Sequence, residues 1–305
     1  MTRKVNRIDL TLNFRRSNMA TVQLGLIQTS GFVEPQKNVE NHLKLIREAA
    51  AKGAQIICLQ EMFTTIYFCH EENEDYFTFA ESIPGSTSEK MQEIAKELGV
   101  VLIVPYFEKR VPGIYHNTAA VIDADGSYLG KYRKMHIPDD PGFYEKFYFT
   151  PGDNGFKVFK TKYAIIGVLI CWDQWFPEAA RLTAMKGAEI LFYPTAIGTL
   201  EHESEKEKQT FRDAWQTIQR SHSVANGCYV ASVNRVGVEN GTKFWGHSFV
   251  SAPFGEIIAQ AGESEEILIS EIDLAKMDNQ RRMWPFFRDR RIDAFSDLTK
   301  RYLVD

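Results

Sequence analysis

The residues best suited to chemistry in this 305-residue chain lie in segment 165–178. An apolar run typical of a strand ends at Cys171, a short turn follows, and Pro177 opens a predicted helix at a position where proline is tolerated. Ligand sites of α/β proteins form at such carboxyl ends of strands. A thiol there, near backbone N–H groups and a helix N-terminus, is expected to be biased towards thiolate. The alternative is that Cys171 is a small core residue.

Two charged residues follow other strand-like segments. Glu61 comes directly after the apolar run 55–60, so it is either a solvated strand end or a base whose charge is tuned by burial. Lys134 ends a basic segment and is either part of a solvated hairpin arm or a functional cation. His136 is the histidine nearest to these residues in the sequence, but no papain-like signature accompanies Cys171.

Familiar cofactor and nucleophile signatures are absent from the sequence. It has no G-x-G-x-x-G after the first predicted strand and no G-x-x-x-x-G-K-[ST], which removes the main support for dinucleotide and P-loop sites. Segment 246–250 lacks the final glycine of a serine-hydrolase elbow. The four cysteines form no C-x-x-C pair and no cluster with zinc spacing. We therefore expect no metal and no other cofactor, and a reduced, cytoplasmic setting.

The composition is that of a globular protein with a large core. Hydrophobic residues make up 44% of the chain, and 36 Lys and Arg oppose 40 Asp and Glu, for a formal net charge of −4. This mild negative charge argues against nucleic acid as a partner. No uncharged apolar stretch approaches the ~20 residues of a membrane helix. We expect a small-molecule substrate, no nucleic acid and no membrane partner.

Strands and helices alternate along the chain from residue 22 onward. The helical pattern predicts helices over 36–52, from the capping-box pair Ser86 and Glu89 to Gly99, over 177–186, and before Gly227. Strand-like runs lie at 22–29, 55–60, 100–105, 117–122, 128–134, 164–170, 190–193, 229–233, 244–251, 256–260 and 267–272. This order predicts an α/β fold with helix-covered sheets, in a single domain over 19–305.

Residues 1–18 differ from the rest of the chain. They carry five Lys and Arg against a single acid, lack the apolar core of a secretory signal, and precede Met19. We interpret them as a basic leader or an extension ahead of the start site. A basic amphipathic transit segment is the alternative.

Three separated motifs together resemble a known family. Glu61 after its strand, Lys134 in K-Y-R-K-x-H-I-P and Cys171 in I-C-W-D-Q-W-F-P-E resemble the Glu-Lys-Cys signature of the nitrilase (carbon–nitrogen hydrolase) superfamily. The resemblance runs from about residue 22 to 291. C-W-D-Q-W-F-P-E, E-K-F-Y-F-T-P-G-D and the closing F-R-D-R-R are similar to its N-carbamoylputrescine amidohydrolase branch. This implies a four-layer α-β-β-α sandwich, an enzyme acting on non-peptide C–N bonds, and homo-oligomers.

The resemblance also implies how the residues work. Glu61 would take the proton from Cys171, later deliver it to ammonia, and then activate water. Lys134 and the backbone N–H of Trp172 would stabilise the oxyanion. A second glutamate of the family matches Glu145, which would hold Lys134 in place. The products would be putrescine, CO2 and ammonia, formed through an S-carbamoyl intermediate on Cys171.

The residues that follow Cys171 bear on the choice of substrate. Members that act on N-carbamoyl-D-amino acids have arginines shortly after the nucleophile, where this chain has Asp173 and Gln174, and an acid there favours a cationic carbamoyl amine. Aromatic residues that could line a slot for a four-carbon chain, or belong to the core, are Trp172, Trp175, Tyr67 and Phe68. Acids that could meet the distal ammonium, or be solvated, are Asp139, Asp140 and Glu201. N-carbamoyl-β-amino acids and ω-amides are alternative substrates, and a non-catalytic oligomeric scaffold is the alternative of another class.

Overall fold

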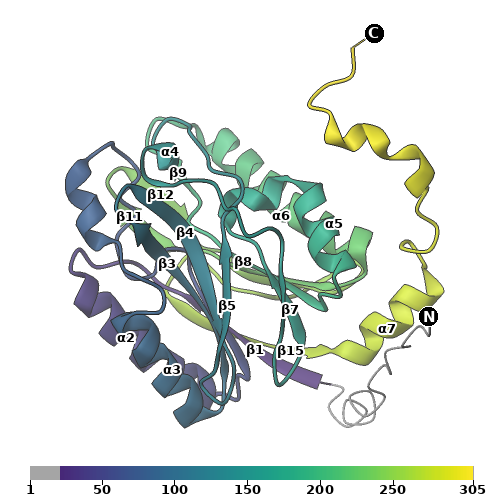
Figure 1. Ribbon diagram of the computed structural model, residues 1–305, viewed down its shortest axis with the longest axis horizontal. Helices are drawn as coiled ribbons and strands as arrows, with labels where there is room; N and C mark the ends of the chain where they lie inside the picture. The colour runs from purple at the N-terminus through teal and green to yellow at the C-terminus, as the bar shows by residue number, and fades with distance from the viewer. Residues whose placement is uncertain (1–20, 305) are drawn as a thin grey trace, which may run out of the picture.

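Two six-stranded sheets lie face to face at the centre of the computed structural model, which describes residues 21–304 (Figure 1). The first sheet contains, in spatial order, β15 (Glu266–Asp273), β1 (Thr21–Gln28), β2 (Ile56–Leu59), β3 (Val101–Val111), β4 (Ile114–Ile122) and β5 (Tyr128–Arg133). The second contains β14 (Ile257–Gln260), β13 (Phe249–Ser251), β10 (Tyr229–Val233), β8 (Ile190–Pro194), β7 (Ile165–Val168) and β6 (Val158–Lys160). A three-stranded sheet is formed by β11 (Val236–Glu239), β12 (Thr242–Trp245) and β9 (Gly198–Leu200).

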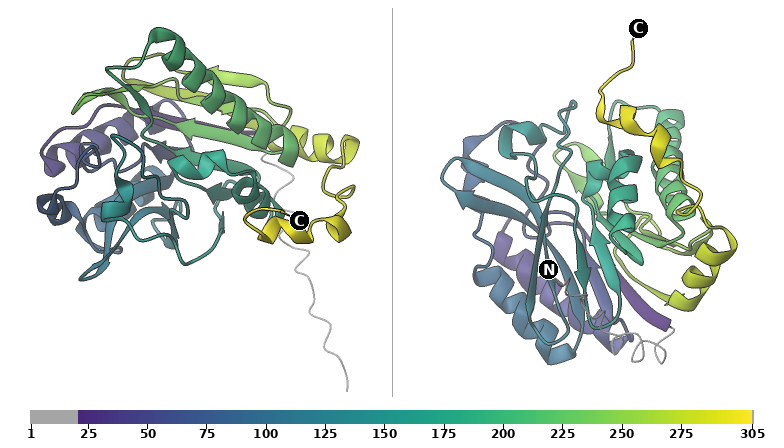
Figure 2. Two further views of the ribbon diagram at one scale, coloured as in Figure 1. Left: turned by 90° about the horizontal axis from the view of Figure 1, so that it is seen from above. Right: turned by 45° about the vertical axis from the view of Figure 1, so that its right-hand side comes forward.

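Helices cover the outer faces of both large sheets (Figure 2). On the first sheet lie α2 (Pro35–Ala51) and α3 (Ser86–Leu98), whose buried residues share one apolar cluster with Ile57, Leu59 and Leu102. On the second lie α5 (Pro177–Met185) and α6 (Glu205–Asn226). The layers are therefore α-β-β-α, which confirms the fold that the resemblance implied.

The central strands are apolar on both faces because each face is covered. Leu26, Ile56 and Ile103 point between the sheets, where they share a cluster with Ile166 and Val168 of the second sheet. The alternate residues of β2 and β3 point towards α2 and α3. Strands buried on both sides have continuous apolar runs of this kind, which is why the sequence located them well.

Strand direction brings three chain segments to one edge of the sandwich. β1, β2 and β3 run parallel, and two antiparallel pairings, β3 with β4 and β4 with β5, return β5 to the direction of β3. Glu61 follows β2, Lys134 follows β5 and Cys171 follows β7 in the second sheet. The carboxyl ends of these three strands position the site.

Several predicted boundaries are wrong. The predicted strand 244–251 is split into β12 and β13, which belong to different sheets, because Gly246 and His247 have φ values of 64° and 55° that interrupt the strand. Ser86 is not the cap of α3: Gly85 occupies that position, and its N–H donates to Ser88 Oγ at 2.7 Å. The predicted end of α6 is confirmed, since Gly227 adopts the left-handed cap conformation with φ 53°.

The chain beyond β15 was not assigned any structure from the sequence. α7 (Leu274–Met283) follows that strand, and the segment after it contacts α5 through Phe287 and Arg290 before its end projects from the molecule, coloured yellow in Figure 1. Apolar side chains along it are exposed, among them Met283, Trp284, Ile292 and Tyr302. The predicted leader, residues 1–18, lies outside the described residues. Over residues 21–304, no helix has the length and apolar character needed to cross a membrane.

Candidate active site

Cys171 is placed by a left-handed turn at the end of β7. Its φ is 42°, a conformation that few residues other than glycine adopt, and a 3-10 turn, η3 (Cys171–Trp175), leads from it into α5. Asp173 closes this turn, because its carboxylate accepts from the Ile170 N–H at 2.9 Å while its own N–H donates to the Ile170 carbonyl at 3.0 Å. The turn lifts the thiol out of the strand and into a cavity.

Asp173 does not face that cavity. Its fully buried carboxylate also accepts from the Tyr132 hydroxyl at 2.7 Å and from the backbone N–H and Nδ1 of His136 at 3.1 and 2.7 Å. The expectation that Asp173 binds substrate does not fit this placement. Its carboxylate instead ties the cysteine turn to the strand end that carries Lys134.

Glu61 is fully buried where the chain leaves β2. The next residue, Met62, again has a left-handed φ, 47°. Glu61 Oε1 accepts from Lys134 Nζ at 2.8 Å and from Asn117 Nδ2 at 2.7 Å. Glu61 Oε2 has no hydrogen-bond partner among the described residues. One oxygen is thus held in place, and the other is free to exchange a proton.

Lys134 lies between two buried carboxylates. Nζ donates to Glu61 at 2.8 Å and to Glu145 Oε2 at 2.7 Å, and the Glu145 Oε1 atom accepts from the Tyr67 hydroxyl at 3.1 Å. Glu145 is the first residue of the short helix α4 (Glu145–Tyr148). Tyr67, expected to touch substrate, is therefore buried against Glu145, and it is not among the residues that line the cavity.

The charges of Lys134, Glu61 and Glu145 determine how these side chains are protonated. Burial opposes the charge of Lys134, but Glu145, Glu61 and Cys171 outweigh it and raise the pKa of the ammonium well above its usual range. Burial raises the pKa of Glu145 to about 7, with Lys134 opposing and Glu61 adding to the shift. One cation cannot neutralise two carboxylates, so near neutral pH the group can take up or release one proton at Glu145.

The thiol of Cys171 is not biased towards thiolate in this arrangement. Burial, followed by the charge of Glu61, raises its pKa well above the ordinary value, while Lys134 and a hydrogen bond with the backbone of Ala196 act in the opposite direction. The early expectation from the helix N-terminus is therefore wrong, because desolvation exceeds the favourable contributions. A neutral thiol needs a neighbouring base to become a nucleophile.

The thiol opens into a cavity of about 490 Å³. Of the predicted site residues, Glu145, Cys171, Trp172 and Trp175 line it, and the rest of the lining comes from three segments and from α6. These further residues are Pro138, Asp140, Pro141, Phe143, Ala196, Ile197, Gly198, Leu200, His202, Glu203, Phe211, Ala214 and Trp245. Among the residues described, the lining includes three carboxylates and no lysine or arginine. Asp139 and Glu201 are not part of it.

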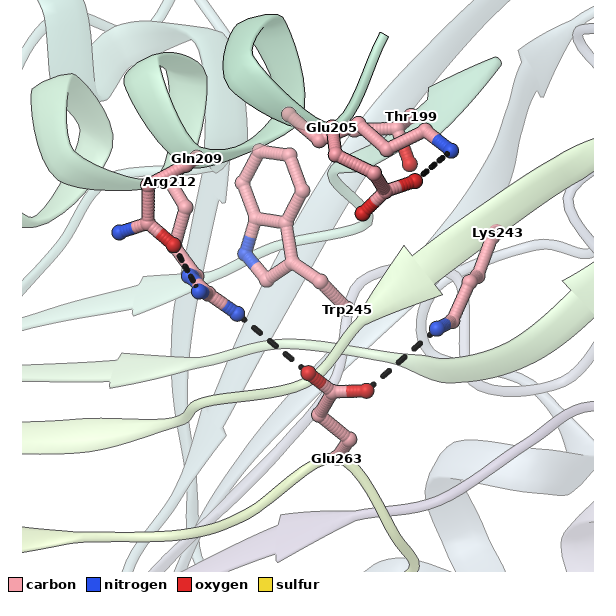
Figure 3. A pocket seen from close by; sticks show the side chains of 8 residues that line it. Thr199, Glu205, Gln209, Arg212, Lys243, Trp245 and Glu263 are labelled. Carbon is pink, nitrogen blue, oxygen red and sulfur yellow. Dashed lines mark hydrogen bonds and ion pairs between the residues drawn. The ribbon is translucent and has the colours of Figure 1, made fainter. Parts of the chain in front are cut away.

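A smaller hollow of about 150 Å³ shares Trp245 with this cavity (Figure 3). Its Arg212 and Lys243 side chains both contact Glu263, each at 3.4 Å. The cations of this hollow are therefore already paired, and nothing in its geometry connects it with the reaction.

Asn117 and Trp245 were missed by sequence reasoning. Asn117 fixes Glu61 from β4, and Trp245 reaches the cavity from the small sheet. Neither belongs to a motif that marks its role. The alternation of β4 places Asn117 on a definite face, but only the pairing of strands shows that Glu61 lies next to it.

Comparisons with known proteins identify the family and the fold of the chain. The carbon-nitrogen hydrolase family model matches residues 19–282. The chain is 48% identical to the N-carbamoylputrescine amidase of Solanum lycopersicum over 86% of this chain and 89% of that protein. It is 41% identical to a citrullinase of Francisella tularensis, over 93% of this chain and all of the relative. The crystal structure of a carbon-nitrogen hydrolase from Helicobacter pylori G27 superposes with a TM-score of 0.90 at 48% identity, covering 93% of this chain and all of that one.

Proposed function

Because the chain belongs to the carbon–nitrogen hydrolase family, and is thus a hydrolase of non-peptide C–N bonds, we propose that it cleaves N-carbamoylputrescine to putrescine, CO2 and ammonia. The observation that carries this proposal is the buried group Glu61, Lys134 and Glu145 beside Cys171, at an acidic cavity. A non-catalytic scaffold would have no use for these residues.

The first step is nucleophilic attack. The free Oε2 of Glu61 takes the proton of the Cys171 thiol as sulfur bonds to the carbonyl carbon of the ureido group, whose oxygen becomes an oxyanion. The ammonium of Lys134 has three N–H donors, and two of them are occupied by Glu61 and Glu145. Its third N–H, together with the backbone N–H of Trp172, would receive the oxyanion.

The second step breaks the C–N bond. Glu61 returns its proton to the departing nitrogen as the C–N bond cleaves, which leaves a thiocarbamate on Cys171. Water then gives one proton to Glu61 as its oxygen bonds to the same carbon, and Glu61 returns that proton to the sulfur as the C–S bond breaks. The resulting carbamic acid decomposes to CO2 and the nitrogen product that has not yet left, which is ammonia if putrescine departs first and putrescine if ammonia departs first. Glu145 keeps Lys134 in position throughout and touches the cavity itself.

The charge of the cavity favours a substrate with a cationic end. Asp140 and Glu203 line the cavity together with Trp172 and Trp175, so acids and apolar surfaces are both available to an aminobutyl chain. A carboxylate at that end would meet like charges, which disfavours N-carbamoyl-β-amino acids and ω-amides that carry a carboxylate as substrates. Asp140, unlike Asp173, has a position suited to the distal ammonium.

We expect kcat/KM for N-carbamoylputrescine to exceed that for N-carbamoyl-β-alanine by roughly 100-fold, because like charges at an interface cost several kcal/mol. Citrulline is the second substrate for comparison, because the Francisella relative is named a citrullinase. In the Asp140→Asn and Glu203→Gln variants, KM for N-carbamoylputrescine should rise about 3- to 5-fold, the effect of a partly solvated ion pair.

N-butylurea, which has the same chain length without the ammonium, is the control substrate. Its KM should not change in either variant. An equal rise for both substrates would mean that these residues shape the cavity and do not recognise charge. Preference of the wild-type protein for the acid would contradict the proposed substrate.

We also propose that the chain acts as a homo-oligomer in the cytoplasm, with residues 19–305 as its single domain. Its exposed C-terminal segment carries Trp284, Ile292 and Tyr302, apolar side chains that a second copy could cover. Light scattering should give a mass above one chain, and deletion of residues 284–305 should lower that mass. A monomeric full-length protein would contradict this proposal.

A further inference from the structure

Arg235, the second residue after β10, is fully buried and reaches across to the segment that carries Glu61. Its Nη2 atom donates to the backbone carbonyls of Glu61 and Met62, each at 3.0 Å. Both of its Nη atoms donate to the carbonyl of Thr65, each at 3.0 Å. One guanidinium therefore binds three carbonyls at the point where the chain leaves β2 through the left-handed Met62.

Glu239 holds this guanidinium in place and extends the same network. Its carboxylate pairs with Arg235 at 2.8 Å and accepts from the backbone N–H of Tyr67 at 2.6 Å and of Gly31 at 3.1 Å. The hydroxyl of Tyr67 in turn donates to Glu145. The two carboxylates that flank Lys134 are thus both connected to the Arg235–Glu239 pair.

The residue before Arg235 fixes the other side of the site. Asn234 accepts from the N–H of Ile197 at 3.0 Å and donates to its carbonyl at 3.0 Å. Ile197 follows Ala196, whose backbone forms the hydrogen bond with Cys171. Asn234 and Arg235 therefore hold two segments: the one that carries Glu61 and the one that carries Ala196 beside Cys171. These segments follow strands of different sheets.

We propose that Arg235 is a positioning residue for the reaction, which acts by fixing Glu61 relative to Cys171. The proposal rests on the proposed function only in taking Glu61 as the base. Arg235 is fully buried, and its hydrogen bonds go to the carbonyls of Glu61, Met62 and Thr65 and to Glu239, so it acts on the protein and not on the substrate. Its planar fork of N–H donors can bind several carbonyls at once, whereas the single ammonium of lysine cannot reproduce that arrangement.

The Arg235→Lys variant tests this role, since it keeps the charge and removes the fork. We expect kcat to fall about 10- to 100-fold with KM changed less than about 3-fold, because misplacement by about 1 Å of a reacting group can cost 10²-fold. We also expect alkylation of Cys171 by iodoacetamide to require a higher pH, because the buried thiol would lose the help of its base. This second measurement does not depend on which amide is the substrate.

Arg281→Lys is the matched control. Arg281 likewise binds three backbone carbonyls, those of Asn226, Gly227 and Ala188, at 3.3, 2.9 and 3.1 Å. These carbonyls precede β10 and β8, at the opposite edge of the sheet from the site. Its substitution should lower the melting temperature but leave kcat and the pH profile of alkylation unchanged.

If Arg235→Lys fails to fold, Gly31→Ala is the alternative test, because it perturbs the Arg235–Glu239 pair without removing either charge. A Cβ at Gly31 would lie 2.8 Å from an Nη atom of Arg235 and 3.1 Å from Glu239, so it would push the guanidinium aside. We expect kcat to fall and the pH profile of alkylation to shift in the same directions as in Arg235→Lys, but by smaller amounts. Wild-type kcat and profile in folded Arg235→Lys or Gly31→Ala protein would overturn the proposal.

Glu61→Gln separates this proposal from the proposed function. If Arg235 acts through Glu61, Arg235→Lys should slow alkylation in the wild-type background and have no further effect in Glu61→Gln. An undiminished effect in Glu61→Gln would indicate general disruption and would overturn the positioning role. If Glu61→Gln alone leaves alkylation unchanged, the assignment of the base is wrong. If Glu61→Gln slows alkylation and Arg235→Lys does not, Arg235 alone has been misassigned.

Discussion

Replacement of Cys171 by alanine is expected to reduce turnover of N-carbamoylputrescine by a factor on the order of 10⁴ to 10⁶, the range seen when a catalytic nucleophile is removed. Glu61 and Lys134 would remain paired at 2.8 Å, so the fold should keep its stability. A base and a cation without a nucleophile can at most assist attack by water. Steady-state kinetics and thermal unfolding of the same preparation measure both expectations.

The control for this substitution is Cys228→Ala. Cys228 is equally buried, but it lies just before β10, at the other edge of the sandwich from Cys171. Its replacement should leave kcat close to the wild-type value. Residual activity above a few per cent in Cys171→Ala would contradict the nucleophilic role.

Mass spectrometry of the enzyme quenched during turnover adds an independent observation. An adduct on Cys171 of one carbamoyl group would mean that putrescine leaves first. An adduct that also retains the aminobutyl chain would mean that ammonia leaves first. Either adduct supports the covalent mechanism, and its absence under rapid quench, with product accumulating, would contradict it.

Substitution of Lys134 by methionine is expected to have the second largest effect. Loss of one oxyanion donor costs about 10² to 10³ in kcat. The change also leaves Glu61 and Glu145 facing each other without a cation, which favours their protonated forms and removes the base. We therefore expect kcat to fall by at least about 10³-fold.

Stability of Lys134→Met should fall in a pH-dependent way. Breaking a buried ion pair by removing one partner costs about 3 to 5 kcal/mol. Burial has already raised the pKa of Glu145 to about 7 in the native protein, and Lys134 is the largest of the contributions that lower it. Without Lys134, the native state holds its carboxyl protons to a higher pH than the unfolded chain does, so stability is lost as pH rises above about 4.5. The deficit in melting temperature should be larger at pH 8 than at pH 5.

The double variant Lys134→Met with Glu145→Gln is the corresponding control. It removes one of the two unpaired carboxylates, so it should regain part of the stability at pH 8 and none of the activity. Recovery of activity would show that Lys134 serves only to neutralise Glu145. An equal deficit at both pH values would contradict the proposed electrostatic origin of the stability loss.

Much of the site could be predicted because its residues follow apolar strands. Glu61 and Cys171 each come directly after a run that reads as a buried strand, Lys134 ends the predicted strand 128–134, and the structure places all three segments at one edge. Their order along the chain, together with the motif around Cys171, was enough to identify the family.

Orientation and burial could not be predicted in the same way. Asp173 lies two residues from Cys171, yet its carboxylate points to Tyr132 and His136, which are distant in sequence. The pKa of the thiol depends on how many atoms exclude water from it, and no short motif encodes that number. The break between β12 and β13 depends on the left-handed conformation of His247, a residue that does not usually adopt it.

The division of the site between two sheets has a consequence for biosynthesis. The carboxylates and the ammonium are supplied by residues up to 145, the nucleophile by the strand that ends before 171, and β15 near the carboxyl end pairs along its full length with β1. A nascent chain on the ribosome therefore carries its reactive groups well before it can juxtapose them. Hydrolytic competence should arise only once the second sheet has formed and packed against the first.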